Sequence, residues 1–161
     1  MSKVIFPGSF DPFTVAHADI LFRAAKLFDK IYVAILNNDA KKPFFSLKER
    51  ETFIAKTLGE LKNIEILSFS GLLVDIYQRL NADAVLRGLR DSRDYLYECD
   101  MAAANKHLYP NIDVIFLQSR TELAYISSSL VKSIGTFGGS LSGLVPDVNI
   151  NYISGRLNND E

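Results

Sequence analysis

Ile31-Tyr32-Val33-Ala34-Ile35-Leu36 is the stretch that decides the predicted fold, because it is apolar or β-branched throughout. A strand with one face in water alternates apolar and polar residues, whereas a continuous apolar run is typical of a strand covered on both faces. Strands of that kind belong to parallel sheets with helices on each side. The stretch therefore predicts the central part of an α/β protein.

Strand-like runs recur on both sides of this stretch, with helical patterns between them. The expected strands are residues 4–6, 31–36, 64–69, 84–86 and 114–117. The expected helices run from Ala16 to Phe28, from a capping box at Ser46, over 72–80, from Ser92 to about Tyr109, after Ile126, and from Pro146. This alternation predicts a Rossmann-like, doubly wound five-stranded parallel sheet with helices on both faces. The Gly-rich residues 137–140 are expected to join the last two helices, so residues 1–161 are read as a single domain.

The composition excludes several classes of protein. Of 161 residues, 18 are Lys or Arg and 19 are Asp or Glu, so no overall positive field attracts nucleic acid or an anionic membrane. The lone cysteine, Cys99, can form neither an internal disulfide nor a thiolate cluster, and two histidines with it argue against a transition-metal site. No apolar run approaches the ~20 residues that span a bilayer, and no signal peptide is recognisable, so we expect a cytoplasmic protein.

Cations, hydroxyl groups and a histidine follow the expected strands. In an open parallel sheet, ligands bind beyond the carboxyl ends of the strands. The segments at those ends are residues 7–17, 41–43, 87–93 and 120–129. With a net charge of −1, this local gathering of cations predicts a phosphate-binding site.

Each candidate residue also has an ordinary structural explanation. His17, in the first turn of a helix, can donate a hydrogen bond to a phosphate or serve as a surface or capping histidine. Lys41 and Lys42 can bind phosphate or be a solvated pair. Arg87 and Arg90 can grip phosphate oxygens or be charges at the start of a helix.

Three further features carry less information about function. Residues 127–129 are serines that can cap the next helix, and the same groups can receive phosphates, so the two interpretations are compatible. His107 lies near the end of the long helix, where a cation complements the helix dipole, which favours a structural role. Cys99 is interpreted as a helix-packing residue.

Four motifs in this order and spacing resemble the phosphopantetheine adenylyltransferase family of bacterial nucleotidyltransferases. They are Pro7-Gly8-Ser9-Phe10-Asp11-Pro12 with Thr14-Val15-Ala16-His17, Lys41-Lys42-Pro43, Arg87-Gly88-Leu89-Arg90, and Ile126-Ser127-Ser128-Ser129. Together they cover nearly the whole chain, which makes the resemblance specific.

The resemblance implies a function and its partners. Members transfer the adenylyl group from ATP to 4′-phosphopantetheine, which yields dephospho-CoA and pyrophosphate in coenzyme A biosynthesis. Mg²⁺ is expected on the triphosphate, with no metal ligand from protein side chains. A homohexamer is expected, with CoA or dephospho-CoA as product or feedback ligand and with neither nucleic acid nor membrane as partner.

The resemblance also implies roles for individual residues of a single nucleotidyltransferase domain. His17 contacts the α-phosphate and stabilises the transition state, and Lys41 and Arg87 hold the phosphate of phosphopantetheine. Ser9 lies between the substrates. Leu73 and Asn105 line the pantetheine arm. The residues that match the ATP site are Ser9, Phe10, His17, Gly88, Leu89, Arg90, Glu98, Leu123, Ala124, Tyr125, Ile126, Ser127, Ser128 and Ser129.

Two positions depart from the family pattern. Ala16 stands where glycine usually precedes the histidine, and Thr136 stands where some members have arginine. Two alternative functions therefore stay open: a small nucleotidyltransferase acting on nicotinamide mononucleotide or glycerol phosphate, and a nucleotide-binding module without catalysis. Retention of His17, Lys41 and Arg87 argues against the second.

Overall fold

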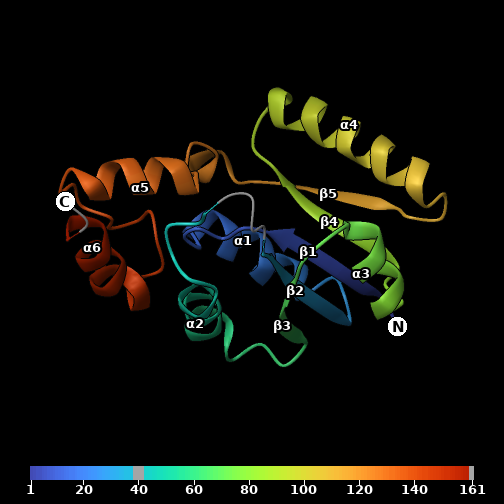
Figure 1. Cartoon of the computed structure of the whole chain (residues 1–161), viewed down its shortest axis with the longest axis horizontal. Helices are drawn as coiled ribbons and strands as arrows, with labels where there is room; N and C mark the ends of the chain where they lie inside the picture. The colour runs from blue at the N-terminus through green and yellow to red at the C-terminus, as the bar shows by residue number, and fades with distance from the viewer. Residues whose placement is uncertain (38–41, 160–161) are drawn as a thin grey trace.

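A five-stranded parallel sheet forms the centre of the computed structural model, which describes residues 1–37 and 42–159. The strand order is β3-β2-β1-β4-β5 (Figure 1). The strands are β1 (Lys3–Gly8), β2 (Lys30–Leu36), β3 (Ile64–Phe69), β4 (Ala84–Leu89) and β5 (Val114–Gln118). The predicted α/β class and the five parallel strands are confirmed.

Helices follow the strands in the alternation that the sequence predicts. They are α1 (Val15–Ala24), α2 (Leu47–Leu58), α3 (Leu73–Leu80), α4 (Ser92–Leu108), α5 (Ser128–Thr136) and α6 (Ile150–Asn158), with short 3₁₀ turns η1 (Thr121–Leu123) and η2 (Asp147–Asn149). The capping box predicted at Ser46 is present: Ser46 Oγ accepts the Glu49 N–H, and Glu49 Oε2 accepts the Ser46 N–H. Residues 137–140 join α5 to the segment that leads to α6, as expected.

Successive strand residues point to opposite faces of the sheet, and each face has its own core. Val4 and Phe6 of β1 belong to the larger core, which packs against α1, α2, α5 and α6. Ile5, between them, belongs to the smaller core together with Val85 and residues of α3 such as Ile76. Helices therefore cover both faces, which is why β1 and β2 are apolar almost throughout.

A crevice opens between β1 and β4 at the carboxyl ends of the strands. β1 pairs with β2 along its whole length but with β4 only at Val4 and Ile5. Pro7 has no N–H to donate, and its carbonyl oxygen accepts a hydrogen bond from Arg87 Nη1 at 2.7 Å. The direction in which strands are added to the sheet reverses here. β2 and β3 lie on one side of β1, whereas β4 and β5 lie on its other side. A reversal of this kind is where open α/β sheets bind ligands.

Four predicted boundaries were wrong. β1 continues through Pro7 and Gly8, since it keeps its register with β2, and β4 continues to Leu89, so Arg87 lies inside a strand. A charged residue fits there because its guanidinium donates to Glu98 and to the Pro7 carbonyl, as described below. α1 ends at Ala24, because the next backbone hydrogen bonds join residues three apart, as in a 3₁₀ turn. α6 begins at Ile150, after the 3₁₀ turn that follows Pro146.

Candidate active site

Thr14 and His17 form a reciprocal cap at the start of α1. Thr14 Oγ1 accepts the backbone N–H of His17 at 3.4 Å, and His17 Nδ1 accepts the backbone N–H of Thr14 at 3.1 Å. The capping interpretation of His17 is therefore confirmed. It involves only Nδ1 and leaves Nε2 available to a ligand, so capping does not exclude the phosphate role.

The surroundings of His17 keep its imidazole neutral. Burial, together with the positive charges of Arg90 and Arg87, lowers the pKa of His17 from 6.5 to about 4. Because Nδ1 accepts the Thr14 N–H, the proton of the neutral ring is assigned to Nε2. His17 is thus arranged as a neutral hydrogen-bond donor at physiological pH.

Aromatic rings hold the His17 imidazole in place. Phe10 meets it edge to face with ring centroids 5.2 Å apart, and Phe13 stacks on it at 5.5 Å. Phe10 is buried and has a positive φ of 49°. Its ring lies so close to Gly8 that a Cβ there would be 2.8 Å from it, so glycine is required. Any contact of Phe10 with a nucleotide would therefore use its backbone.

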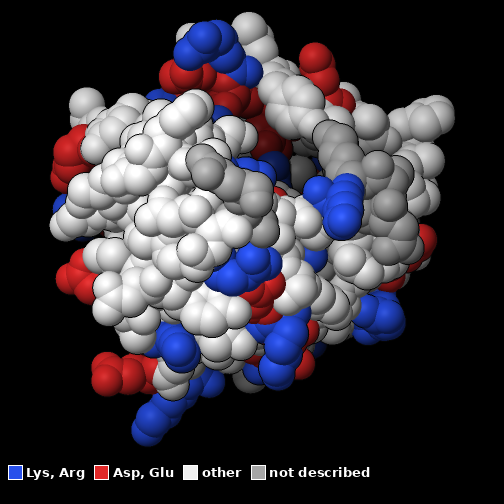
Figure 2. Space-filling view, turned by 60° about the vertical axis from the view of Figure 1, so that its left-hand side comes forward, with Lys and Arg blue, Asp and Glu red and all other residues white. Residues whose placement is uncertain are grey.

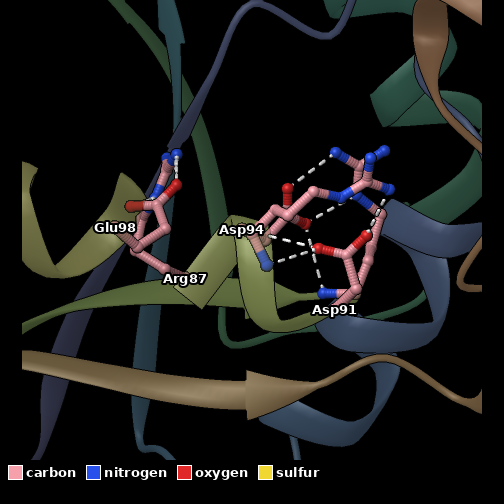
Figure 3. A network of polar contacts seen from close by, with 6 residues as sticks. Arg87, Asp91, Asp94 and Glu98 are labelled. Atoms are coloured by element: carbon pink, nitrogen blue, oxygen red, sulfur yellow. Dashed lines mark hydrogen bonds and ion pairs between the residues drawn. The ribbon is translucent and has the colours of Figure 1, made fainter. Parts of the chain in front are cut away.

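Arg87 is held by a buried carboxylate from α4 (Figure 3). Arg87 Nε donates to Glu98 Oε2 at 2.8 Å, Nη2 donates to Glu98 Oε1, and Nη1 donates to the Pro7 carbonyl. Glu98, predicted as a nucleotide contact, thus places both of its oxygens on Arg87. The pair fixes the direction of the guanidinium at the mouth of the crevice.

Asp91 and Asp94, labelled in Figure 3, form a neighbouring group of charges at the start of α4, which Arg90 joins. Asp91 caps α4 by accepting the N–H groups of Arg93 and Asp94. Arg90 makes a two-pronged contact with Asp94 at 2.7 and 3.0 Å. The structural interpretation of Arg90 is therefore realised, and its charge still acts on His17.

A cavity of about 720 Å³ lies at this edge of the sheet, and Figure 2 shows the hollow with charged side chains in its depth. Seven of the predicted site residues line it: Ser9, Leu73, Arg87, Glu98, Asn105, Ser128 and Ser129. Among the described residues, the cavity lining does not include Phe10, His17, Gly88, Leu89, Arg90 or residues 123–127. Lys41 lies outside the described residues, and its neighbour Lys42 lines the cavity. The structure thus brings together four of the five predicted acceptor residues, Ser9, Leu73, Arg87 and Asn105, and leaves most of the predicted nucleotide residues outside the lining.

The serines of the fourth motif open α5. Ser127 is the N-cap residue, and its Oγ accepts the Leu130 N–H at 3.1 Å. Ser128 Oγ donates to the Pro12 carbonyl at 2.7 Å, which ties α5 to the first motif. The capping interpretation is confirmed for Ser127, and phosphate binding by this segment stays a prediction.

The sequence analysis missed Arg50, a buried residue that shapes the site. Arg50 of α2 is 1% exposed, and its guanidinium donates to the carbonyl oxygens of Ser9 at 2.8 Å, Leu36 at 3.2 Å and Phe45 at 3.1 Å. Arg50 thereby joins three segments that meet at the cavity. A signal was available, because Arg50 falls on the apolar face of its helix, three residues after Leu47, where a charge needs a buried partner.

Asp11 and Lys132 were also not assigned a role. Asp11 lies within the first motif, and Lys132 lies on α5 beyond the last. Their side chains are 2.9 Å apart, and both residues line the cavity. They form an ion pair between segments that are distant in sequence, which a single sequence does not reveal.

The structure shows where Ala16 and Thr136, the two departures from the family pattern, lie. Ala16 is in the first turn of α1 and is buried in the larger core, so its backbone is helical and alanine causes no strain there. Thr136 is the exposed last residue of α5. His107 is exposed in the last turn of α4, as expected.

The carboxylates of the cavity are already occupied by cations. Asp11 pairs with Lys132 and Glu98 pairs with Arg87. In the part of the chain that the structure describes, no group of three or more His, Cys, Asp or Glu side chains could hold a metal ion. This donor set fits a metal that arrives on a phosphate ligand. Over the same residues, no helix is long and apolar enough to cross a membrane.

The fold and the sequence both match one class of proteins. Residues 5–134 match the cytidylyltransferase-like family. The nicotinic acid mononucleotide adenylyltransferase of Plasmodium falciparum, solved in complex with NaAD, has the same fold, with a TM-score of 0.67 at 17% identity over 95% of each chain. The class is therefore the cytidylyltransferase-like nucleotidyltransferases.

Closer relatives narrow the class. The phosphopantetheine adenylyltransferase of Clostridium tetani is 44% identical over 159 residues, which are 99% of each chain. That of Caldanaerobacter subterraneus is 47% identical over 148 residues, which are 92% of each chain. The chain belongs to the phosphopantetheine adenylyltransferase family.

Proposed function

We propose that this chain transfers the adenylyl group of ATP to 4′-phosphopantetheine, releasing pyrophosphate and forming dephospho-CoA in coenzyme A biosynthesis. The observation that carries the proposal is the cavity, whose lining brings Ser9 and Arg87 together with Leu73 and Asn105. Relatives at 44–47% identity over nearly the whole chain support the choice of acceptor.

The chemistry requires two anions to meet. The phosphate of phosphopantetheine attacks the α-phosphorus of ATP in line, and pyrophosphate leaves. Catalysis then consists of aligning both groups and stabilising the charge that develops on the α-phosphate. No covalent bond to the protein is needed.

His17 fits the role of stabilising the transition state. Its neutral ring presents the Nε2 proton, and Thr14, Phe10 and Phe13 fix the direction of that ring. A donor that is already positioned costs no reorganisation during the reaction. His17 moves no proton in this proposal; it donates a hydrogen bond to the α-phosphate as that group gains charge.

Arg87 is placed to hold the attacking phosphate. Glu98 and the Pro7 carbonyl direct its guanidinium while leaving N–H groups of Nη1 and Nη2 for a ligand. Lys41 is proposed to act with it. Ser9, whose carbonyl is fixed by Arg50, lies between the two substrates.

The rest of the cavity suits the pantetheine arm. The arm is narrow and largely apolar, with two amide groups. Apolar residues of the lining include Leu36, Phe69, Leu72, Leu73, Tyr97 and Met101, and Asn105 supplies an amide partner. The nucleotide is proposed to contact the remaining predicted residues: Phe10 through its backbone, Gly88, Leu89, Arg90, Glu98, and Leu123 to Ser129.

Mg²⁺ is proposed to accompany ATP. Bound to the triphosphate, it would neutralise charge on the leaving pyrophosphate. Because Asp11 and Glu98 are paired with cations, the phosphates rather than these carboxylates would hold it.

We also propose a homohexamer in the cytoplasm, with CoA or dephospho-CoA able to return to the site as ligand. The support for assembly is α4, which exposes Leu96 and Leu108, two apolar residues outside the cavity lining. Exposed apolar side chains gathered on one element are typical of an interaction surface. Light scattering should give a particle of six times the 18.0 kDa chain mass.

The test of the activity is pyrophosphate release from ATP and Mg²⁺ with three acceptors. We expect release with 4′-phosphopantetheine and none with nicotinamide mononucleotide, or with glycerol phosphate and CTP. Release with only another acceptor would reassign the substrate. Binding of ATP without release in any mixture would favour a non-catalytic module.

The matched variant is His17→Ala, assayed beside His107→Ala, which removes the exposed histidine of α4. If His17 acts in the transition state, His17→Ala lowers kcat by about 100-fold or more while the Kd for ATP changes little. Equal losses in kcat and in ATP affinity would contradict that role. His107→Ala should leave both unchanged.

A further inference from the structure

Glu49 joins the start of α2 to α6, which lies beside it (Figure 1). Its Oε2 accepts the Ser46 N–H at 2.8 Å as part of the capping box. Its Oε1 accepts hydrogen bonds from Arg156 Nε at 2.8 Å and from the Tyr152 hydroxyl at 2.9 Å. A capping box needs only Ser46 and Glu49, so the two contacts from α6 are additional to it.

These contacts keep the Glu49 carboxylate charged. Burial acts to raise its pKa, but hydrogen bonds from Arg156, Ser46 and Tyr152 outweigh burial and lower the pKa from 4.5 to about 2. The side chain of Glu49 is 16% exposed and that of Arg156 is 37% exposed. The ion pair is therefore partly shielded from water, where it contributes more than a pair on an open surface.

Arg156 also covers the two phenylalanines that precede the capping box. Its guanidinium carbon lies 5.4 Å from the centre of the Phe44 ring and 5.9 Å from that of the Phe45 ring. The two rings meet edge to face, with centroids 4.8 Å apart. A cation over aromatic faces at such distances is attracted to them. Arg156 thus holds both rings while its Nε holds Glu49.

The backbone of the same two phenylalanines is held by residues of the cavity. Asp11 accepts the Phe44 N–H at 2.9 Å and the Phe45 N–H at 2.8 Å, and Arg50 donates to the Phe45 carbonyl at 3.1 Å. Asp11 and Arg50 both line the cavity. Phe44 and Phe45 are therefore fixed from the cavity through their main chain and from α6 through their rings.

A short, stiff connection carries this hold to the phosphate site. Pro43, whose ring fixes its φ angle, is the one residue between Phe44 and Lys42. Lys42 and Pro43 line the same cavity as Arg87. A shift of Phe44 would therefore move Lys42 relative to Arg87, which is proposed to hold the phosphate of the acceptor.

We propose that Glu49 and Arg156 are positioning residues for the acceptor, through which α6 holds residues 42–46 against the cavity. The proposal rests on the adenylyl transfer proposed above. The lysine side of the phosphate site is then formed before phosphopantetheine binds, so binding does not have to order it. The residues proposed for the nucleotide come from other segments, which include α1, the end of β4 and residues 123–129, so their positions depend less on α6.

The experiment compares Arg156→Met, which removes the charge, with Arg156→Lys, which keeps it, and with Tyr152→Phe, which removes one hydrogen bond. Lys30→Met is the matched control. Lys30, at the amino end of β2 and away from the cavity, pairs with Glu65 at 2.7 Å and lies 5.4 Å from the centre of the Tyr32 ring. It thus loses an ion pair and a cation–π contact of the same kinds. For every variant, kcat, both KM values and Tm are measured.

Arg156→Met should raise the KM for phosphopantetheine about 5- to 20-fold, whereas kcat at saturation and the KM for ATP should change less than about twofold. Arg156→Lys should restore part of the affinity, and Tyr152→Phe should raise this KM about twofold. Lys30→Met should bind both substrates as wild type does, even where its Tm falls. An unchanged KM for phosphopantetheine in Arg156→Met, or an equal rise in both KM values, would overturn the proposal.

Glu49 is tested together with Arg156. Glu49→Gln removes the charge but still allows a capping box, so it should raise the KM for phosphopantetheine about 3- to 10-fold. In the Arg156→Met background the same change should add less than about twofold, because the ion pair is already broken. Effects that multiply in full would show that Glu49 does not act through Arg156, and would overturn the proposed link.

Titration calorimetry with phosphopantetheine in the absence of ATP separates this proposal from the proposed function. An inactive wild type that binds phosphopantetheine, with weaker binding in Arg156→Met, would reject the function and keep the positioning role. An active wild type whose Kd for phosphopantetheine is unchanged in Arg156→Met would keep the function and reject the positioning role. A wild type that does not bind phosphopantetheine would overturn both.

Discussion

The protonation of His17 can be followed directly, because the chain has only two histidines. An imidazole in water titrates near pH 6.5. Burial and the charges of Arg90 and Arg87 lower the pKa of His17 to about 4. At pH 7 about 0.1% of the His17 rings would then carry a proton, against about a quarter for an ordinary histidine. The neutral donor on which the proposed mechanism depends is thus the dominant form.

The same difference makes stability depend on pH. The pKa of His17 is lower in the folded chain than in the unfolded chain, so between pH 6.5 and about 4 the unfolded chain binds more protons. The free energy of unfolding therefore falls as the pH drops through that window, by at most about 1.4 kcal/mol per pH unit from this group. His17 as a residue is of intermediate burial, so solvent screening reduces the effect below that limit.

The assay is a proton NMR titration of the imidazole Cε1–H signals from pH 8 to the acid limit of the fold. His107, exposed on α4, provides the second signal, and His107→Ala assigns it. The His17 signal should stay at the neutral position down to about pH 5, and urea unfolding should show wild type losing stability between pH 7 and 5 relative to His17→Gln. A His17 midpoint between pH 6 and 7 would refute the argument, because the ring would then be partly charged under working conditions.

Three further changes test single contacts of the fold and site. Glu98→Gln keeps the shape but weakens the hold on Arg87, so the KM for phosphopantetheine should rise about 10-fold with a smaller change for ATP, as steady-state kinetics would show. Ala16→Gly restores the usual family residue. It should lower the free energy of unfolding, measured by urea titration, by about 0.5–1 kcal/mol and should not raise kcat/KM. A gain in kcat/KM would show that the methyl group of Ala16 obstructs ATP. Ser127→Ala removes the cap of α5 and should cost about 1 kcal/mol by the same measurement, whereas no loss would show the cap to be unimportant.

The order and type of the elements could be predicted because each has a local signal. β2 is continuously apolar since both of its faces are buried, and Ser46 caps α2 through contacts within four residues. Boundaries were less predictable. Arg87 resembles a loop residue in the sequence, and its partners Glu98, eleven positions away on α4, and the Pro7 carbonyl make it suitable for a strand.

The residues of the candidate site likewise fall into those that the sequence could predict and those that it could not. Residues that face the cavity from short motifs, such as Ser9 and Ser128, could be predicted from their place after a strand. Arg50 and Asp11 could not, because their partners are backbone groups brought near by folding: Arg50 binds three carbonyl oxygens, and Asp11 binds two N–H groups. A single sequence records which residues are charged and does not record which main-chain atoms they will meet.

α4 connects the site to the proposed assembly. Within α4, all of which the structure describes, Glu98 is the one buried residue. The helix is attached to the sheet through the ion pair of Glu98 with Arg87 and the contact of Tyr95 with Phe116. The same helix supplies Asn105 to the cavity and exposes Leu96 and Leu108 outward. A neighbouring chain that covered this outer face would bury apolar surface and restrict the motion of one cavity wall at once. Assembly and affinity for the pantetheine arm are therefore expected to change together, since both depend on where this helix lies.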